Sequence, residues 1–98
     1  MPVIDIHTHM YSHAWMRLLR ERAAPLYTVG PVAQGRECIF RCDAPVAVPT
    51  PGHFDYELRL RDMDRAGVDL SVVSLTCPNV YWGGRETSGL AARLVNDE

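Results

Sequence analysis

The sequence predicts an α/β fold in which parallel β-strands alternate with α-helices. Two β-type runs, residues 3–9 and 68–75, are each followed along the chain by a helical pattern. A repeated strand-to-helix order of this kind implies parallel strands joined by right-handed crossovers. The run from Val68 to Leu75 is almost continuously apolar, which is typical of strands buried on both faces. We therefore expect both strands to lie deep in the protein.

The first strand is expected to lead into a helix that begins after Ser12 and runs to about Arg22. Ser12 is a good N-cap residue, and Pro25 ends the helical pattern. Residues 26–50 then hold three short β-type runs, separated by turn-forming glycine and proline residues. This region predicts a small antiparallel β insertion after the first strand.

The second half of the chain predicts a helix, a strand, a loop and a last helix. Asp55 is a good N-cap for a helix that ends at Gly67, since glycine favours the left-handed backbone found at helix ends. The strand 68–75 follows, and a loop covers residues 76–85. The last helix is expected to open at Thr87 or Ser88.

His7 and His9, in the first strand, carry the most specific chemical signal. Alternate side chains of a strand share one face and lie about 6.5–7 Å apart, so two imidazoles can lean toward one ion. Asp5 would share that face and orient an imidazole, or satisfy backbone donors. The pair predicts a divalent metal site, with zinc as the expected ion. The alternative is two histidines that point into water.

The other ligand-type side chains show no metal spacing. Cys38, Cys42 and Cys77 form no Cys-x-x-Cys pair, so we expect free thiols in a reducing cytoplasm. His13 and His53 are expected at surface or capping positions. A zinc ion needs about four ligands, so the isolated chain is expected to be inactive without ligands from a later part of a longer protein.

Charge and hydropathy exclude several classes of partner. The net charge of −2 gives no support for binding nucleic acid or an anionic membrane. No apolar stretch approaches the roughly 20 residues of a membrane span. We therefore expect a cytoplasmic protein that binds neither nucleic acid nor membrane.

Two parallel strands alone cannot bury both of their faces. A closed (β/α)8 TIM barrel uses eight strand–helix units over about 250 residues, of which this chain would supply roughly the first quarter. We therefore expect residues 1–98 to form an incomplete barrel domain, with the β insertion at 26–50. In this interpretation the chain is the N-terminal portion of a metal-dependent (β/α)8 TIM barrel.

Several stretches together carry a family resemblance. They are Asp5-Ile6-His7-Thr8-His9-Met10, Ile39-Phe40-Arg41, the run from Arg61 to Asp69, Val80-Tyr81-Trp82, and the run from Leu94 to Glu98. In this combination the chain resembles the amidohydrolase superfamily, in particular the branch that contains aminocarboxymuconate-semialdehyde decarboxylase. The resemblance spans essentially all 98 residues and the N-terminal portion of a family member.

The resemblance implies a distorted (β/α)8 barrel, a divalent metal that is usually zinc, and often a homodimer. His7 and His9 would correspond to the first two metal ligands of the family. Arg41 would correspond to an arginine that grips a substrate carboxylate, for which a planar guanidinium is suited. The alternative for Arg41 is a solvated hairpin residue. Trp82, beside Tyr81, would either line a pocket for a planar substrate or pack within its loop.

The expected function is therefore a metal-dependent carboxy-lyase (decarboxylase) or hydrolase. Its substrate would be a small unsaturated or aromatic carboxylate, and these residues would form the N-terminal part of the full enzyme. One alternative is a non-catalytic barrel fragment that acts as a binding or interaction module. Another is a barrel phosphoesterase that also opens with His-x-His, although Arg41 and the Met10-Tyr11 continuation favour the decarboxylase-like branch.

Overall fold

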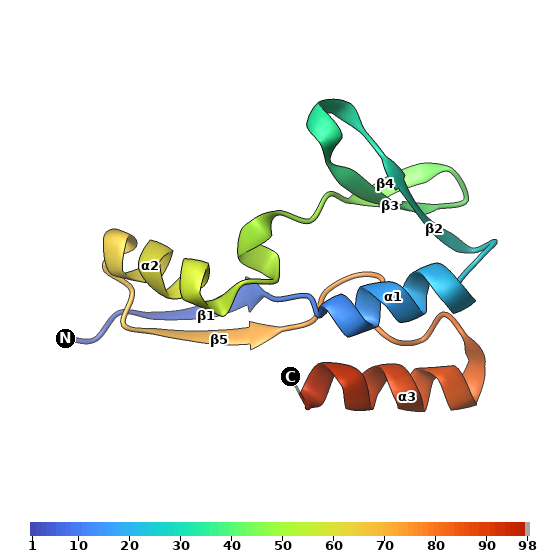
Figure 1. Cartoon of the computed structure of the whole chain (residues 1–98). Coiled ribbons are helices and arrows are strands. Elements are labelled where there is room, and N and C mark those ends of the chain that lie inside the picture. Colours follow the sequence, from blue (N-terminus) through green and yellow to red (C-terminus); the bar gives the residue numbers. More distant parts are fainter. Residues whose placement is uncertain (98) are drawn as a thin grey trace.

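Residues 1–97, which the computed structural model describes, form two separate β-sheets and three α-helices (Figure 1). The parallel sheet pairs β1 with β5, and the antiparallel sheet has the order β2-β3-β4. The bounds of the strands are β1 Ile4–His9, β2 Tyr27–Pro31, β3 Glu37–Arg41, β4 Ala44–Ala47 and β5 Leu70–Ser74. The helices are α1 His13–Arg22, α2 Tyr56–Ala66 and α3 Gly84–Asn96, with short 3-10 turns η1 Ala33–Gly35 and η2 Pro51–His53.

The predicted caps set the ends of α1 and α2. The Ser12 hydroxyl accepts a hydrogen bond from the backbone N–H of Trp15 at 3.1 Å. At the start of α2, a carboxylate oxygen of Asp55 accepts from the backbone N–H of Leu58, also at 3.1 Å. Gly67 ends α2 with a φ of 74°, a left-handed conformation that glycine adopts without a steric penalty. The predictions for these two helices are confirmed.

The last helix begins earlier than predicted. α3 starts at Gly84 rather than at Thr87 or Ser88. Gly83 lies so close to the Thr87 side chain that an added Cβ would come within 2.5 Å of its Cγ2 atom. Gly84 has a φ of 82°. The two glycines therefore let the chain turn tightly into the helix, and Thr87 becomes a buried residue of its first turn.

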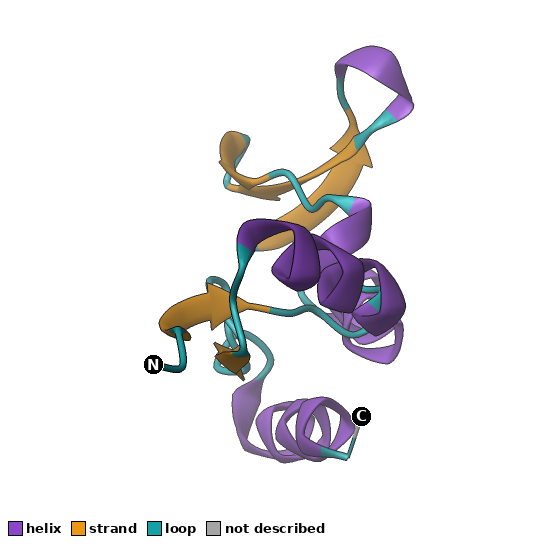
Figure 2. Ribbon diagram, turned by 90° about the vertical axis from the view of Figure 1, so that its left-hand side faces the viewer, coloured by secondary structure: helices purple, strands orange, loops and turns teal. Residues whose placement is uncertain are grey.

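The largest buried side chains gather around α1. Trp15, Leu19 and Ile39 are fully buried, and Trp82 and Ala91 pack into the same cluster. In Figure 1 α1 lies between the antiparallel sheet on one side and α3 on the other, and Figure 2 shows the same layers from the side. An ion pair of 2.6 Å between Arg20 and Glu37 also joins α1 to β3. The core is thus built from helices and the antiparallel sheet.

The prediction that the parallel strands are deeply buried is wrong. The side chain of Ile6 in β1 is 79% exposed, and Leu70 and Val72 in β5 are 54% and 55% exposed. One face of the β1–β5 sheet packs against α2, through contacts such as the Ser71 hydroxyl with the Met63 sulfur. On the other face, the apolar side chains stay largely exposed, because no element of residues 1–97 covers them fully.

The predicted fold class is therefore corrected. The described residues are α/β, but they show neither barrel closure nor the pattern of a TIM-barrel fragment. The physical reason is that α1 packs against α3 on one side and against the antiparallel sheet on the other, rather than onto the parallel strands. The segment 26–50 does form an antiparallel sheet, as predicted.

Candidate functional site

His7 and His9 lie at the end of β1, and their rings meet edge-to-face. The ring centroids are 5.1 Å apart and the ring planes meet at 82°. Two imidazoles bound to one tetrahedral zinc through nitrogens at about 2.0–2.1 Å would have centroids roughly 5 Å apart. An edge-to-face contact gives the same spacing without an ion. The pair therefore fits two positions of a zinc shell, and metal titration distinguishes the two explanations.

The imidazole of His9 is held from the neighbouring strand. Its Nδ1 lies 3.3 Å from the carbonyl oxygen of Ser74 and 3.3 Å from the Ser74 hydroxyl. Since a carbonyl oxygen only accepts, a hydrogen bond to it requires the proton on Nδ1. Nε2 of a neutral ring then keeps its lone pair, which is the form in which histidine binds a metal. Bonds from outer groups commonly orient metal-binding histidines in this way.

A β-bulge interrupts β1 between Asp5 and Thr8, in the span that contains His7. Asp5 pairs with Ser71, whereas Thr8 pairs with Val73, so β1 contains one residue more than β5 between these two pairs. A carboxylate oxygen of Asp5 accepts a hydrogen bond from the backbone N–H of His7 at 3.1 Å. This local bond satisfies a donor where the ladder is irregular.

The bulge separates Asp5 from the two imidazoles. A one-residue slip reverses which face each later side chain occupies. Asp5 faces α2, where it lines a cavity of about 300 Å³ together with Asp62 and Met63. Thr8 faces α2 as well, since its hydroxyl lies 2.7 Å from a guanidinium nitrogen of Arg59. The expectation that Asp5 shares a face with the histidines is therefore wrong.

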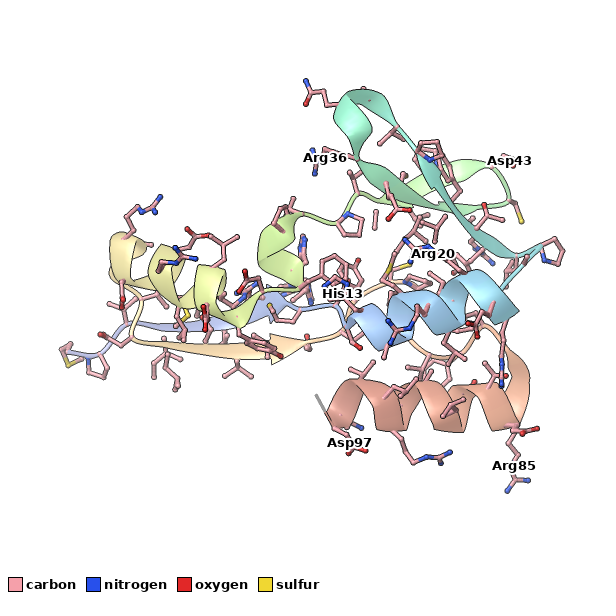
Figure 3. All side chains as sticks on the ribbon, viewed as in Figure 1. His13, Arg20, Arg36, Asp43, Arg85 and Asp97 are labelled. Atoms are coloured by element: carbon pink, nitrogen blue, oxygen red, sulfur yellow. The ribbon has the colours of Figure 1, made fainter. Side chains whose placement is uncertain are left out.

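Arg41 is exposed at the end of β3, opposite Tyr27 and Ala44 on the neighbouring strands. Figure 3 shows Asp43, in the turn that follows Arg41, at the end of the antiparallel sheet remote from β1. The structure thus places the predicted carboxylate-binding residue on a different sheet from the histidines and does not bring them together.

Trp82 lies in the core rather than on a pocket wall. It is 7% exposed, and its ring meets Trp15 edge-to-face with centroids 6.4 Å apart. Its indole N–H donates to the carbonyl oxygen of Asn79 at 2.8 Å. The neighbouring Tyr81 is instead exposed. The aromatic pair thus divides into one packing residue and one surface residue.

His53 and Arg59, near the two histidines, make more structural contacts than the sequence predicted. The Nδ1 atom of His53 accepts a hydrogen bond from the backbone N–H of Thr50 at 2.9 Å, which confirms its predicted capping position. Burial lowers the pKa of His53, and its electrostatic interactions with Arg59 and His9 lower it further. Arg59 binds the end of β1 directly, through bonds that spacing along the chain does not reveal.

Tyr11 connects the end of β1 to the core. Its ring stacks on Trp15 with centroids 5.3 Å apart, and its hydroxyl donates to the carbonyl oxygen of Cys77 at 3.2 Å. Burial, with a smaller contribution from Cys77, raises the pKa of the Tyr11 phenol. The group therefore stays protonated and keeps its role as a donor.

The remaining ligand-type side chains do not complete the site. All three cysteines are free thiols, with Cys38 buried and Cys42 and Cys77 exposed. Within residues 1–97, no three or more His, Cys, Asp or Glu side chains are grouped around one position. The two imidazoles are thus the donor set that this part of the chain offers.

Comparison with known proteins adds no further assignment. Neither a scan against protein-family models nor a search of the curated proteins finds a match for this chain. Over residues 1–97, no helix combines the length and the apolar character that crossing a bilayer requires.

Proposed function

We propose that His7 and His9 hold a divalent metal ion, with zinc as the expected ion, in a metal-dependent carboxy-lyase or hydrolase. The observation that supports the proposal is the contact of the two imidazoles, edge-to-face with centroids 5.1 Å apart. The reaction class, and a small unsaturated or aromatic carboxylate as substrate, come from the resemblance of the sequence to the amidohydrolase superfamily. The barrel architecture is not part of the proposal.

The residues of this chain would supply two ligands and their orientation. His7 and His9 would bind as neutral imidazoles, and the Ser74 carbonyl would keep the His9 proton on Nδ1. When bound, such an ion supplies Lewis-acid chemistry that polarises a substrate oxygen and acidifies water. A tetrahedral shell has two further positions, to be filled by water or by groups outside the described residues.

Arg41 stays in the proposal as the group that would bind the substrate carboxylate. Its side chain is exposed at the end of β3 and is therefore open to a ligand. A carboxylate bound to Arg41 could lie next to His7 only if the antiparallel sheet moved toward β1. Trp82 could contact a substrate only if its loop left the core, so its part in substrate binding is the weaker of the two.

The test of metal binding is a Co²⁺ titration of the 98-residue chain, followed by absorbance and calorimetry. Wild-type protein should bind one ion per chain. His7→Ala and His9→Ala should each weaken binding by more than about tenfold, or about 1.4 kcal/mol. His13→Ala is the matched control, because His13 is exposed and stacks on Phe54, with centroids 4.4 Å apart. Unchanged affinity in both ligand variants would refute the assignment.

The reaction class needs a separate assay with a metal-loaded enzyme. Release of CO2 from an aromatic carboxylate would support the decarboxylase, and cleavage of an ester or amide would support the hydrolase. Release of phosphate from an aryl phosphate would favour the phosphoesterase alternative instead.

A second candidate function is a non-catalytic binding module. The observation that favours it is the open face of the β1–β5 sheet, where Ile6 and Val72 are exposed. Apolar side chains gathered in this way commonly mark an interaction surface. This function requires no metal, so it predicts that His7→Ala and His9→Ala leave the binding of a partner unchanged.

A further inference from the structure

We infer that Arg59 is a positioning residue for His9, setting the direction in which its imidazole points. As a statement about a metal ligand, this inference rests on the proposed function. Arg59 lies in α2 and binds three consecutive residues at the end of β1. Its Nη1 donates to the Thr8 hydroxyl at 2.7 Å and its Nη2 to the His9 carbonyl oxygen at 2.8 Å. Its Nε donates to the Met10 sulfur, also at 2.8 Å.

These contacts fix which way the His9 side chain points. Successive side chains of a strand alternate between its two faces. Arg59 ties both neighbours of His9, Thr8 and Met10, to the face covered by α2. The imidazole between them must therefore point to the opposite face, where its Nδ1 meets Ser74 and its ring meets His7. Without this clamp, the bulge between Asp5 and Thr8 would leave the alternation of side chains at the strand end weakly defined.

Arg59 is itself well placed by α2. The helix begins after Asp55, and the backbone N–H of Arg59 donates to the Asp55 carbonyl at 3.0 Å, which closes the first helical turn. The side chain is half-buried, and the carboxylates of Asp5 and Asp62 line the same cavity. The guanidinium is satisfied by its bonds to the Thr8 hydroxyl and the His9 carbonyl, which offset the cost of partly burying a positive charge.

A lysine could not replace Arg59 in this role. A planar guanidinium presents several N–H groups in fixed directions, which allows it to bind a hydroxyl and a carbonyl at once. The ammonium of a lysine is a single point with rotating donors. Lysine at this position should therefore keep the charge and at most one of the contacts.

The test compares wild type with Arg59→Met, Arg59→Lys and the control Arg61→Met. Methionine keeps much of the arginine length but donates no hydrogen bond, and Arg61 is an exposed arginine of the same helix. The first readout needs no metal: the nuclear Overhauser contact between the His7 and His9 rings. The second readout is the affinity for Co²⁺. The indole resonances of Trp15 and Trp82 report whether the core stays folded.

Wild type and Arg61→Met should show the contact between the rings. Arg59→Met should lose it and bind Co²⁺ about 10- to 100-fold more weakly, the range typical of groups that orient metal ligands. Arg59→Lys should fall between them. A ring contact and cobalt affinity unchanged in Arg59→Met would overturn the inference. If Arg59→Met fails to fold, Arg59→Lys provides the test. A ring contact and a cobalt affinity equal to those of wild type in that variant would then overturn the inference.

The two proposals fail in different ways. If wild type shows the ring contact but binds no Co²⁺, the proposed metal function falls. The role of Arg59 in orienting His9 is then decided by the ring contact alone. If wild type binds Co²⁺ through both histidines while Arg59→Met behaves as wild type, the metal site stands and Arg59 has no positioning role.

Discussion

At the scale of single residues, His53 stabilises its own turn and connects that turn to the chain that follows β1. Its Nδ1 accepts from the backbone N–H of Thr50, and its carbonyl oxygen accepts from the backbone N–H of Tyr11 at 2.6 Å. The first bond requires an unprotonated Nδ1. Burial, and then electrostatic interactions with Arg59 and His9, lower the pKa of His53, so the folded protein favours the neutral ring.

This environment predicts a loss of stability in acid. As the pH falls below about 6.5, the unfolded chain takes up a proton at residue 53 that the folded protein resists. The free energy of unfolding should therefore decrease with falling pH, until the pH lies below the lowered pKa of the folded state. His53→Asn keeps a side-chain acceptor without a titrating group, so its stability should depend less on pH. Urea unfolding at pH about 7.5 and about 5 measures the difference.

His13→Asn serves as the control, since His13 is an exposed histidine outside this cap. It should lose as much stability in acid as wild type. If His53→Asn also loses as much as wild type, the protonation of His53 does not control the acid sensitivity.

The same scale shows what residue spacing could and could not predict. The i, i+2 spacing of His7 and His9 predicted that their rings would meet, and they do. It also predicted that Asp5 would join them, which is wrong because β1 contains a bulge. A bulge depends on how two strands pair, and the partner strand lies far away in the sequence. The contacts of Arg59 were missed for the same reason.

At the scale of elements, β1 and β3 carry similar isoleucines in opposite environments. Ile39 in β3 is fully buried in the core, whereas Ile6 in β1 is 79% exposed. Ile39→Ala should therefore cost about 2–5 kcal/mol of stability, because it removes packed methyl groups and leaves a cavity. Ile6→Ala should change stability by no more than about 0.5 kcal/mol. Urea unfolding of both variants beside wild type measures the contrast.

The two variants share one chemical change and so control for each other. A cost for Ile6→Ala comparable to that for Ile39→Ala would mean that the face of the β1–β5 sheet is covered in solution. A concentration-dependent cost would point to another copy of the chain as the cover, as in the binding-module function.

Element ends were predictable because their signals are local. Ser12, Asp55 and Gly67 act on backbone groups within four residues, so the sequence reveals them. Burial of a strand is not local. The apolar run 68–75 predicted a buried strand, but its burial depends on which helices pack against it, and α1 and α3 pack elsewhere.

At the scale of the whole molecule, the chain is elongated, with extents of 46 × 33 × 18 Å. One region holds the core around α1, α3 and the antiparallel sheet, and the other holds β1, β5 and α2 (Figure 1). The second region contributes little to the buried cluster. Regions with few buried apolar contacts open more readily than the core of the same protein.

This division predicts that different probes will report different unfolding transitions. Both tryptophans, Trp15 and Trp82, belong to the core, so their fluorescence follows that region. Far-ultraviolet circular dichroism also detects α2, which should melt at lower denaturant concentration. The circular dichroism curve should therefore begin to fall before the fluorescence curve. Coincident curves would show that the two regions unfold as one unit.

The barrel prediction failed at this scale. Alternating strands and helices are compatible with many sheet arrangements, and the order of elements does not say which face each helix covers. In this chain α1 turns away from the parallel strands after Tyr11, because its apolar side packs against β3 and α3. The distinction lies in contacts between segments distant in sequence.

Tyr11 also determines how the protein should respond to a mechanical load. A pull on the N-terminus would detach β1 from β5 one residue pair at a time, starting from Ile4, because little core packing resists it. The peeling would first have to break the bonds of Arg59 to Thr8 and His9. It would then stop at Tyr11, which is held by its backbone bond to His53, its hydroxyl bond to Cys77 and its stacking on Trp15. Tyr11 thus acts as an anchor, because β1 can be extended under force while the core stays folded.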